Sequence, residues 1–465
     1  MKKYYLLSFA LVIIGISNAQ FTDLYYFNNN TTSGANPNGT LALSGNVLYG
    51  MTEYGGQYSN GSIFCINTDG SGYRDLFDFN GTSTGKLPLG SVTLIGNKLY
   101  GMARGGAFLS GIIFSIDTDG NGFNAMFNFN GSTGNTPCGS LTQVGGLLYG
   151  MTNSGGTKNW GTIFSIDTSG SGFRTLYSFD NTHGGDPQTD LLYAGTNKLY
   201  GMTTSYGANG IGCIFSVDTS GNDYLDMHDF VYATGGNPYG DLTLIGGKLY
   251  GMPNYGGLDS MGCIFSIDTS GTGYKDILAF NGVNGEYPAG TLAYSVTDGL
   301  IYGMTTGGGA DSVGNIFTLD TNGTNYTDIF DFDTAEGVNP AGSVILTGGN
   351  TIYGMTNSGG SHNNGTIFRL KTIITSINGV SSNSGAVKIY PNPSNGMFTF
   401  ELKVNSEKLK VEVYNIMGEK VYSQYSIANA QFSIDLNTQP AGIYFYRITD
   451  KEGASIGSGK LVIQK

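Results

Sequence analysis

Charged residues are scarce in this sequence, and their balance excludes one broad class of function. Only 12% of the 465 residues are Asp, Glu, Lys or Arg, and 34 acidic residues stand against 22 basic ones. The resulting formal net charge of −12 would repel a phosphate backbone. We therefore expect no nucleic-acid partner.

Histidine is also rare, and its positions match no catalytic or zinc motif. The three histidines are His183, His228 and His362, and none stands at a zinc-type spacing. The pattern G-x-S-x-G occurs at residues 81–85 and 453–457, but a catalytic serine of this type stands at a strand-to-helix turn, and glycine at this density opposes helices. Isolated acidic residues could form a glycosidase pair only if the fold brought two of them together. The sequence favours a non-catalytic protein, with a polysaccharide-acting glycosidase or lyase as the alternative.

The sequence has only four cysteines, and their positions argue against disulfides. Cys213 and Cys263 both stand in a Gly-Cys-Ile-Phe context, in adjacent copies of a repeat described below. Equivalent positions in neighbouring repeats are usually further apart than the Cα separation of about 7 Å that a disulfide tolerates. We expect buried free thiols instead.

Long apolar runs are missing except at the very start. Residues 5–16 form one apolar run, which follows Lys2 and Lys3 and precedes the small residues 17–19. The run is too short to span a bilayer, and this order of segments is typical of a cleaved export signal. We predict a signal peptide over residues 1–19, an exported protein and no transmembrane segment.

Glycine and aromatic residues are abundant, and they are arranged in a repeat. Tyr-Gly-Met occurs seven times at intervals of 49–52 residues, and Ile-Phe follows each copy. The seven tyrosines are Tyr49, Tyr100, Tyr149, Tyr200, Tyr250, Tyr302 and Tyr353. A period this regular indicates a repeat architecture.

Each repeat contains four short apolar segments separated by turns rich in Gly, Asn and Asp. One set covers residues 73–79, 91–95, 98–103 and 111–117. Four strands in ~50 residues are typical of one propeller blade, and glycine at this density opposes helices. We predict an all-β chain with a seven-bladed β-propeller over residues 20–372. An open β-solenoid is the alternative.

The first residues after the export signal suggest how the propeller closes. Residues 23–27 resemble residues 75–79, a segment that follows Ile-Phe in the other repeats and is missing from the seventh. We expect residues 22–27 to supply the outer strand of the last blade. Closure of this kind leaves no sheet edge open to aggregation.

The sequence motifs of the repeat resemble those of a known family. Leu-Tyr-Gly-Met-Thr, then Gly-Gly, then Gly-Thr-Ile-Phe is similar to the tandem GloVer repeats of secreted bacterial proteins, over roughly residues 21–372. The resemblance implies a repeat body of unassigned biochemical role.

The composition changes after the last repeat. We interpret residues 373–387 as a linker and residues 388–465 as a small antiparallel β-sandwich. This segment resembles the type A C-terminal sorting domain of the type IX secretion system of Bacteroidetes. Motif residues that carry the resemblance are Tyr390, Pro391, Asn392, Pro393, Gly442, Tyr444 and Lys460. The resemblance implies the type IX secretion machinery as a partner, and a secreted protein that is either released or attached to the outer cell surface.

One turn resembles a calcium-binding loop. Asp117, Asp119 and Asn121 stand at the spacing that opens an EF-hand loop, but Asn128 occupies the position of its essential Glu. A hairpin turn is the preferred interpretation. Calcium remains the alternative, and we expect no other cofactor.

The loop after Tyr-Gly-Met varies most between repeats and carries a ring side chain in six of them. These residues are Tyr54, Phe108, Trp160, Tyr206, Tyr255 and His362. Exposed rings could stack on sugars or anchor a surface protein, or they could pack against neighbouring loops. We predict a monomeric binding protein for a glycan or protein ligand, with a purely structural surface protein as a further alternative.

Overall fold

A computed structural model describes residues 20–348, 350–372, 387–402, 409–415, 420–427, 431–450 and 455–465. The chain divides into two compact units, with the division between residues 373 and 374. The predicted signal peptide and nearly all of the predicted linker lie outside the described residues.

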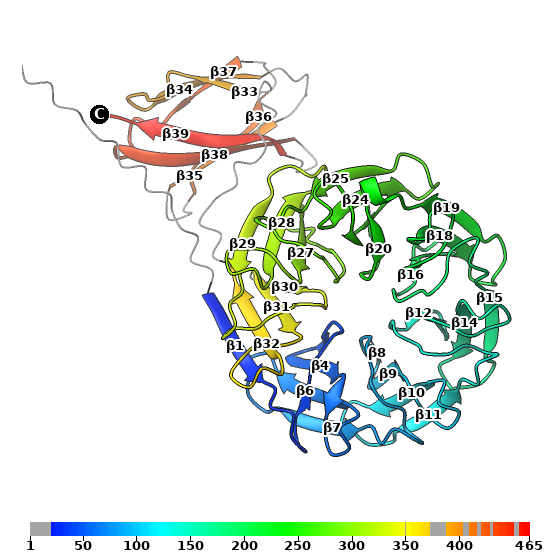
Figure 1. Cartoon of the computed structure of the whole chain (residues 1–465). Coiled ribbons are helices and arrows are strands. Elements are labelled where there is room, and N and C mark those ends of the chain that lie inside the picture. Colours follow the sequence, from blue (N-terminus) through cyan, green and yellow to red (C-terminus); the bar gives the residue numbers. More distant parts are fainter. Residues whose placement is uncertain are drawn as a thin grey trace, which may run out of the picture. The chain divides into compact units, whose positions relative to one another are not determined.

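The first unit contains seven four-stranded antiparallel sheets among its described residues, which follow one another around a ring (Figure 1). We call them blades one to seven. From the inner strand outward, the first four are β3(Ala42–Ser44), β4(Val47–Thr52), β6(Ser62–Asn67), β7(Arg74–Asp78); β8(Thr93–Ile95), β9(Lys98–Ala103), β10(Ile112–Asp117), β11(Asn124–Asn128); β12(Thr142–Val144), β13(Leu147–Thr152), β14(Thr162–Asp167), β15(Arg174–Ser178); β16(Leu192–Tyr193), β17(Lys198–Met202), β18(Cys213–Asp218), β19(Leu225–Asp229).

The remaining blades are β21(Thr243–Ile245), β22(Lys248–Gly251), β24(Cys263–Asp268), β25(Lys275–Ala279); β26(Ala293–Tyr294), β27(Leu300–Thr305), β28(Asn315–Asp320), β29(Thr327–Asp331); β30(Ile345–Thr347), β31(Thr351–Thr356), β32(Thr366–Lys371), β1(Gln20–Tyr26). Two small ladders pair β2(Gly34–Ala35) with β5(Tyr54–Gly55) and β20(Gly236–Pro238) with β23(Pro253–Tyr255). A 3-10 turn, η1, covers Tyr232–Thr234. The predicted all-β propeller class is confirmed.

The predicted closure of the ring is also confirmed. Strand β1 pairs antiparallel with β32, with Asp23 opposite Phe368 and Tyr25 opposite Ile367. The first described strand therefore completes the last blade, and Figure 1 shows β1 beside β32. Across this junction, the Phe21 ring stacks on Phe330 of blade six at 4.3 Å between centroids.

The register of the two middle strands explains why Tyr-Gly-Met and Ile-Phe recur together. In blade two, Gly101 lies directly opposite Phe114. A Cβ atom on Gly101 would lie 2.5 Å from the Phe114 ring, and the equivalent distance is 2.4–2.7 Å in all seven blades. Glycine is therefore required because the ring lies over it.

Aromatic stacking joins the outer strands of neighbouring blades. The ring pairs are Tyr25–Tyr73, Phe77–Phe123, Phe127–Phe173, Tyr177–Tyr224, His228–Tyr274 and Phe330–Phe21, with centroids 3.7–4.3 Å apart. His228 thus occupies a packing position between two blades. The four cysteines are buried and free, as predicted.

The second unit is built from two sheets. One contains β33(Val387–Tyr390), β34(Met397–Leu402) and β37(Gln431–Asp435), and the other has the order β36(Lys420–Ile427), β35(Leu409–Asn415), β38(Gly442–Asp450), β39(Ser455–Ile463). Buried residues from both sheets, among them Phe398, Phe400, Val411 and Ile448, form one core cluster. This arrangement matches the predicted antiparallel β-sandwich.

The sorting motif ties the start of this unit to its end. The Asn392 side chain donates to the Lys460 carbonyl (2.8 Å) and accepts from the Val462 N–H (2.9 Å). The Tyr444 hydroxyl donates to the Pro440 carbonyl at 3.0 Å. Asn392 therefore fixes its loop against the last strand, β39, and Tyr444 fixes the turn before β38.

Candidate functional site

Two kinds of long loop meet on one face of the first unit. One joins the second and third strands of a blade, and the other leads from an outer strand to the next blade. Isolated β-bridges join the two kinds of loop, for example between Lys86 and Arg104 and between Glu286 and Gly307. We call this side the long-loop face. It is the face on which the sequence places the variable loops.

The predicted ring residues lie in loops of six different blades. Tyr54, Phe108 and Tyr255 are 43%, 63% and 42% exposed. His362 is also exposed, and its Nδ1 atom lies 2.9 Å from the Ser361 hydroxyl. Tyr54, Phe108 and His362 belong to blades one, two and seven, none of which neighbours blade five, which carries Tyr255.

The fold brings Trp160 and Tyr206 into contact, but this contact is part of the packing between neighbouring loops. Their ring centroids are 4.2 Å apart with an interplanar angle of 57°. Trp160 is half-buried and packs against the core between blades three and four. This pair therefore matches the alternative in which rings pack between neighbouring loops.

A second aromatic group was missed by the sequence analysis. Tyr287 lies 5.4 Å from Tyr255 between ring centroids, at an angle of 53°. Tyr239 is 38% exposed, and its pKa is raised by burial and by the neighbouring Tyr255 phenol. We call Tyr239, Tyr255 and Tyr287 the tyrosine platform. The other repeats carry no aromatic residue at the positions of Tyr239 and Tyr287. This difference between repeats is the feature of the sequence that could have identified the two residues as candidates.

Backbone hydrogen bonds hold the platform in place. The Tyr287 N–H donates to the Met261 carbonyl at 2.9 Å, and the Tyr287 carbonyl accepts the Thr306 hydroxyl at 2.6 Å. Tyr255 lies at the end of β23 and pairs with Gly236 of β20. The rings therefore extend from fixed backbone rather than from a free loop.

A polar groove is lined by the residue that precedes Tyr287 in the chain. Glu286, which precedes Tyr287, lines a groove of 690 Å³ together with Val283, Asp328 and Asp331. The Asp331 carboxylate also accepts the Ala310 N–H at 2.9 Å. The site thus combines exposed aromatic surface with carboxylate hydrogen-bond acceptors.

A belt of hydrogen bonds closes around the inside of the ring. Just before each inner strand, a backbone N–H donates to a side-chain oxygen of the equivalent residue in the next blade. The last link runs from the Ser343 N–H to the Thr40 hydroxyl at 3.0 Å. We define the inner belt as Thr40, Ser91, Ser140, Asp190, Asp241, Thr291 and Ser343. It joins all seven blades.

The belt contains two adjacent acids where the other blades carry Ser or Thr. One Asp241 oxygen accepts the Asp190 N–H at 2.6 Å, and the other accepts the Thr291 hydroxyl at 2.6 Å. Burial raises the pKa of Asp190, and the nearby Asp241 charge raises it further. Both Asp241 oxygens are therefore used within the belt.

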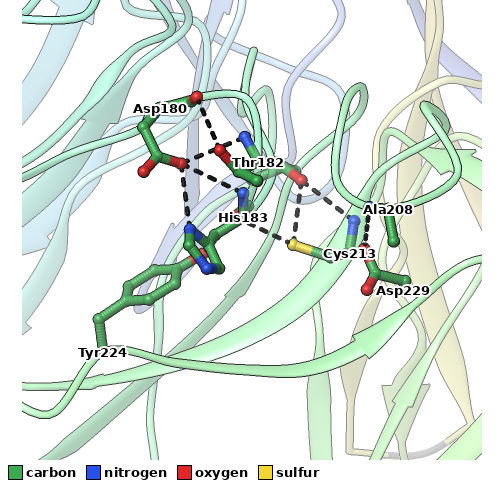
Figure 2. A network of polar contacts seen from close by, with 8 residues as sticks. Asp180, Thr182, His183, Ala208, Cys213, Tyr224 and Asp229 are labelled. Atoms are coloured by element: carbon green, nitrogen blue, oxygen red, sulfur yellow. Dashed lines mark hydrogen bonds and ion pairs between the residues drawn. The ribbon is translucent and has the colours of Figure 1, made fainter.

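The first part of the inter-blade loop after blade three brings a histidine and an acid together (Figure 2). Asp180 Oδ1 accepts the backbone N–H groups of Thr182 and His183 and lies 3.1 Å from His183 Nδ1. Burial opposes the charge, but the bonds from His183 lower the pKa of Asp180. The hydroxyl of the half-buried Tyr224 donates to the His183 carbonyl at 2.7 Å. These contacts are those of a capped turn.

The calcium candidate forms a turn with internal partners. Asp119 Oδ1 accepts the Asn121 N–H at 2.9 Å, and Asp117 pairs with Lys98 at 2.7 Å. Among the residues that the structure describes, no group of three or more His, Cys, Asp and Glu is arranged to hold a metal ion. The internal contacts agree with the preferred hairpin turn, and calcium binding stays the alternative.

Comparison with known proteins assigns both units. The model of the Gloeobacter/Verrucomicrobia repeat matches residues 10–159 and 145–296, and that of the secretion system C-terminal sorting domain matches residues 388–464. The sorting domain indicates a secreted or cell-surface protein. No helix within the described ranges is long and apolar enough to cross a membrane. No curated protein matches the chain.

Several solved structures are similar to this chain at low identity. A fungal alcohol oxidase of the AA5 family in complex with copper has a TM-score of 0.48 and 11% identity, covering 97% of this chain and 100% of its own. The extracellular domain of a hybrid two-component system from B. thetaiotaomicron has a TM-score of 0.48 and 11% identity, covering 96% and 56%. The β-propeller domain of the Trilobed protease from Pyrococcus furiosus has a TM-score of 0.42 and 10% identity, covering 74% and 97%. By its own sequence, the chain belongs to the family of Gloeobacter/Verrucomicrobia repeat proteins and carries a C-terminal secretion sorting domain.

Proposed function

We propose that this exported protein binds a glycan without catalysis, through the tyrosine platform on its long-loop face. The observation that carries the proposal is the grouping of Tyr239, Tyr255 and Tyr287, which are partly exposed. Backbone hydrogen bonds hold Tyr255 and Tyr287 in place. Tyrosine offers an apolar ring for a sugar face and a hydroxyl for hydrogen bonds.

The polar groove supports a carbohydrate over an apolar ligand. Glu286, Asp328 and Asp331 line it, and carboxylate oxygens accept hydrogen bonds from sugar hydroxyl groups. The same acids would repel an anionic ligand. We therefore favour a neutral or basic glycan over an acidic one.

The two belt acids do not favour an enzyme. Asp241 already accepts hydrogen bonds at both oxygens from neighbouring blades. A general acid or base must instead reach the reacting group of the substrate. The repeat body therefore acts as a scaffold in this proposal, and the ligand contacts only its long-loop face.

A glycan array with the full mature chain tests the proposal. For a bound glycan, Tyr255→Ala should weaken binding by about tenfold, because an aromatic contact contributes ~0.5–1.5 kcal/mol beyond its buried area and about 1.4 kcal/mol is tenfold in affinity. Tyr54→Ala is the matched control, since Tyr54 is equally exposed in the same loop position of blade one. A blank array, equal losses in both variants or degradation of a glycan would each overturn the proposal.

A further inference from the structure

The second unit has a net charge opposite to that of the rest of the chain. Residues 388–465 contain 9 Lys and Arg against 7 Asp and Glu, whereas residues 1–387 contain 13 against 27. The sorting unit is therefore net +2 and the remainder −14. A charge asymmetry of this kind favours an anionic partner for the smaller unit.

Four of the positively charged residues that the structure describes lie on the outer face of the sheet containing β35 and β38. On β35, Leu409, Val411 and Val413 point into the core, so Lys410 and Glu412 lie on the opposite face. Glu412 stands directly opposite Arg447 of β38. We define the cationic face as Lys410, Lys420, Arg447 and Lys460.

A single buried carboxylate organises three of these cations. The Glu412 side chain is only 4% exposed, and its oxygens lie 2.8 Å from Lys410 Nζ, 3.1 Å from Lys420 Nζ and 3.1 Å from Arg447 Nη2. Hydrogen bonds from Lys410, Lys420 and others outweigh desolvation and lower the pKa of Glu412 to about 2. The single negative charge of Glu412 therefore pairs with three positive charges, so the cluster has a net charge of +2.

These cations stay accessible although they are held in place. The Lys420 and Arg447 side chains are 49% and 56% exposed. Lys460 extends the face, because it pairs with Phe445, which in turn pairs with Tyr414 beside Glu412. Cations held in fixed positions lose less conformational entropy when a partner binds.

We propose that the cationic face docks the sorting domain on an acidic protein surface of the secretion machinery. The sorting domain implies that the secretion machinery exports the chain. Because the face carries surplus positive charge, the surface that it contacts should be acidic. The Glu412 cluster acts as the preorganised centre of the contact, and Lys460 lies at its side.

Export of the full-length chain from its native cells tests this docking surface. The double variant Lys420→Gln/Arg447→Gln removes two charges and leaves Lys410 and Tyr414 as partners of Glu412. It should accumulate severalfold in the periplasm. The exchange variant Lys420→Arg/Arg447→Lys keeps both charges, and Lys388→Gln removes an exposed charge from the other sheet; both should be exported like the wild type.

Three outcomes would overturn the proposal. Normal export of the Gln double variant would show that the face is not needed. Normal export followed by loss from the cell surface would assign the face to anionic lipopolysaccharide instead. Retention of the exchange variant, together with a lower urea midpoint of the purified chain, would reduce the cluster to a structural role.

Discussion

At the scale of single residues, the repeated Tyr-Gly-Met and Ile-Phe motifs are explained by how they pack against each other. Gly101 lies under the Phe114 ring, and every blade repeats this contact. The Tyr100 hydroxyl also donates to the Thr168 carbonyl of the next blade at 3.3 Å. Tyr-Gly-Met and Ile-Phe therefore recur together because each requires the other. Residues that occur in only one repeat are released from this constraint and are free to serve a ligand.

Gly101→Ala should destabilise the propeller by about 1–3 kcal/mol, the usual cost of overpacking a core. The added methyl group would lie 2.5 Å from a fully buried ring that cannot easily move. Gly146→Ala is the control, because nothing lies within 4 Å of a Cβ atom there. Urea unfolding measures both variants. Equal midpoints for the two would contradict this account of the repeat.

At the scale of strands and blades, two contacts join one end of the ring to the other. Strand β1 completes blade seven beside β32, and the inner belt links the beginnings of the inner strands. The belt needs an oxygen at each position but not a charge. Five blades use a hydroxyl for this purpose, and blades four and five use a carboxylate.

Asp241→Ala should therefore cost about 1–3 kcal/mol, because it leaves the Asp190 N–H without an acceptor. Asp241→Thr should be far milder, since it restores the hydroxyl found in the neighbouring blade. Thermal unfolding of both variants is the measurement. If Asp241→Thr is as unstable as Asp241→Ala, the carboxylate has a role beyond the belt.

At the scale of the whole molecule, buried acids should make stability depend on pH. Burial and a neighbouring acid raise the pKa of Asp75 to about 7 and that of Glu336 to about 7, and similarly raise those of Asp226 and Asp328 to about 6. At a pH between the ordinary pKa and the raised pKa, such a carboxyl is protonated in the folded state but ionised in the unfolded state. Its stabilising contribution is thus complete below about pH 4 and is lost as the pH rises towards 7.

The free energy of unfolding of the propeller should accordingly fall between pH 4.5 and pH 7.5. Asp75→Asn should reduce this fall, because an amide imitates the protonated carboxyl and both Asp75 oxygens are buried without a partner. Asp259→Asn, in an exposed loop, is the control. Urea titrations at both pH values measure the effect. A rise in stability with pH in the wild type would contradict it.

The sequence predicted the scaffold better than the site, for a physical reason. Strand number and closure follow from local patterns that seven copies repeat, and residues 23–27 could be matched to their equivalents by inspection. The tyrosine platform depends on which loops meet across blades. Tyr255 was predicted from its own loop, whereas Tyr239 and Tyr287 lie in connections between blades, where only the folded ring shows their proximity to Tyr255.

The belt was missed for a related reason. Asp190 and Asp241 stand in a position where five repeats carry Ser or Thr, so they resembled ordinary turn acids. Their shared role becomes visible only when each backbone N–H is followed to the next blade. Two of the six predicted ring residues, Trp160 and Tyr206, contact each other, and Trp160 also packs against the core. No pattern within a single repeat distinguishes them from a binding pair.

The central claim is that Tyr255 and Tyr287 bind a glycan as one platform. The most direct test is a double-mutant cycle by titration calorimetry with a glycan found on the array. We predict that Tyr255→Ala and Tyr287→Ala each weaken binding by about tenfold and that the double variant is little weaker than either, because contacting residues are not additive. Fully additive losses, or unchanged affinity in both single variants, would contradict the account.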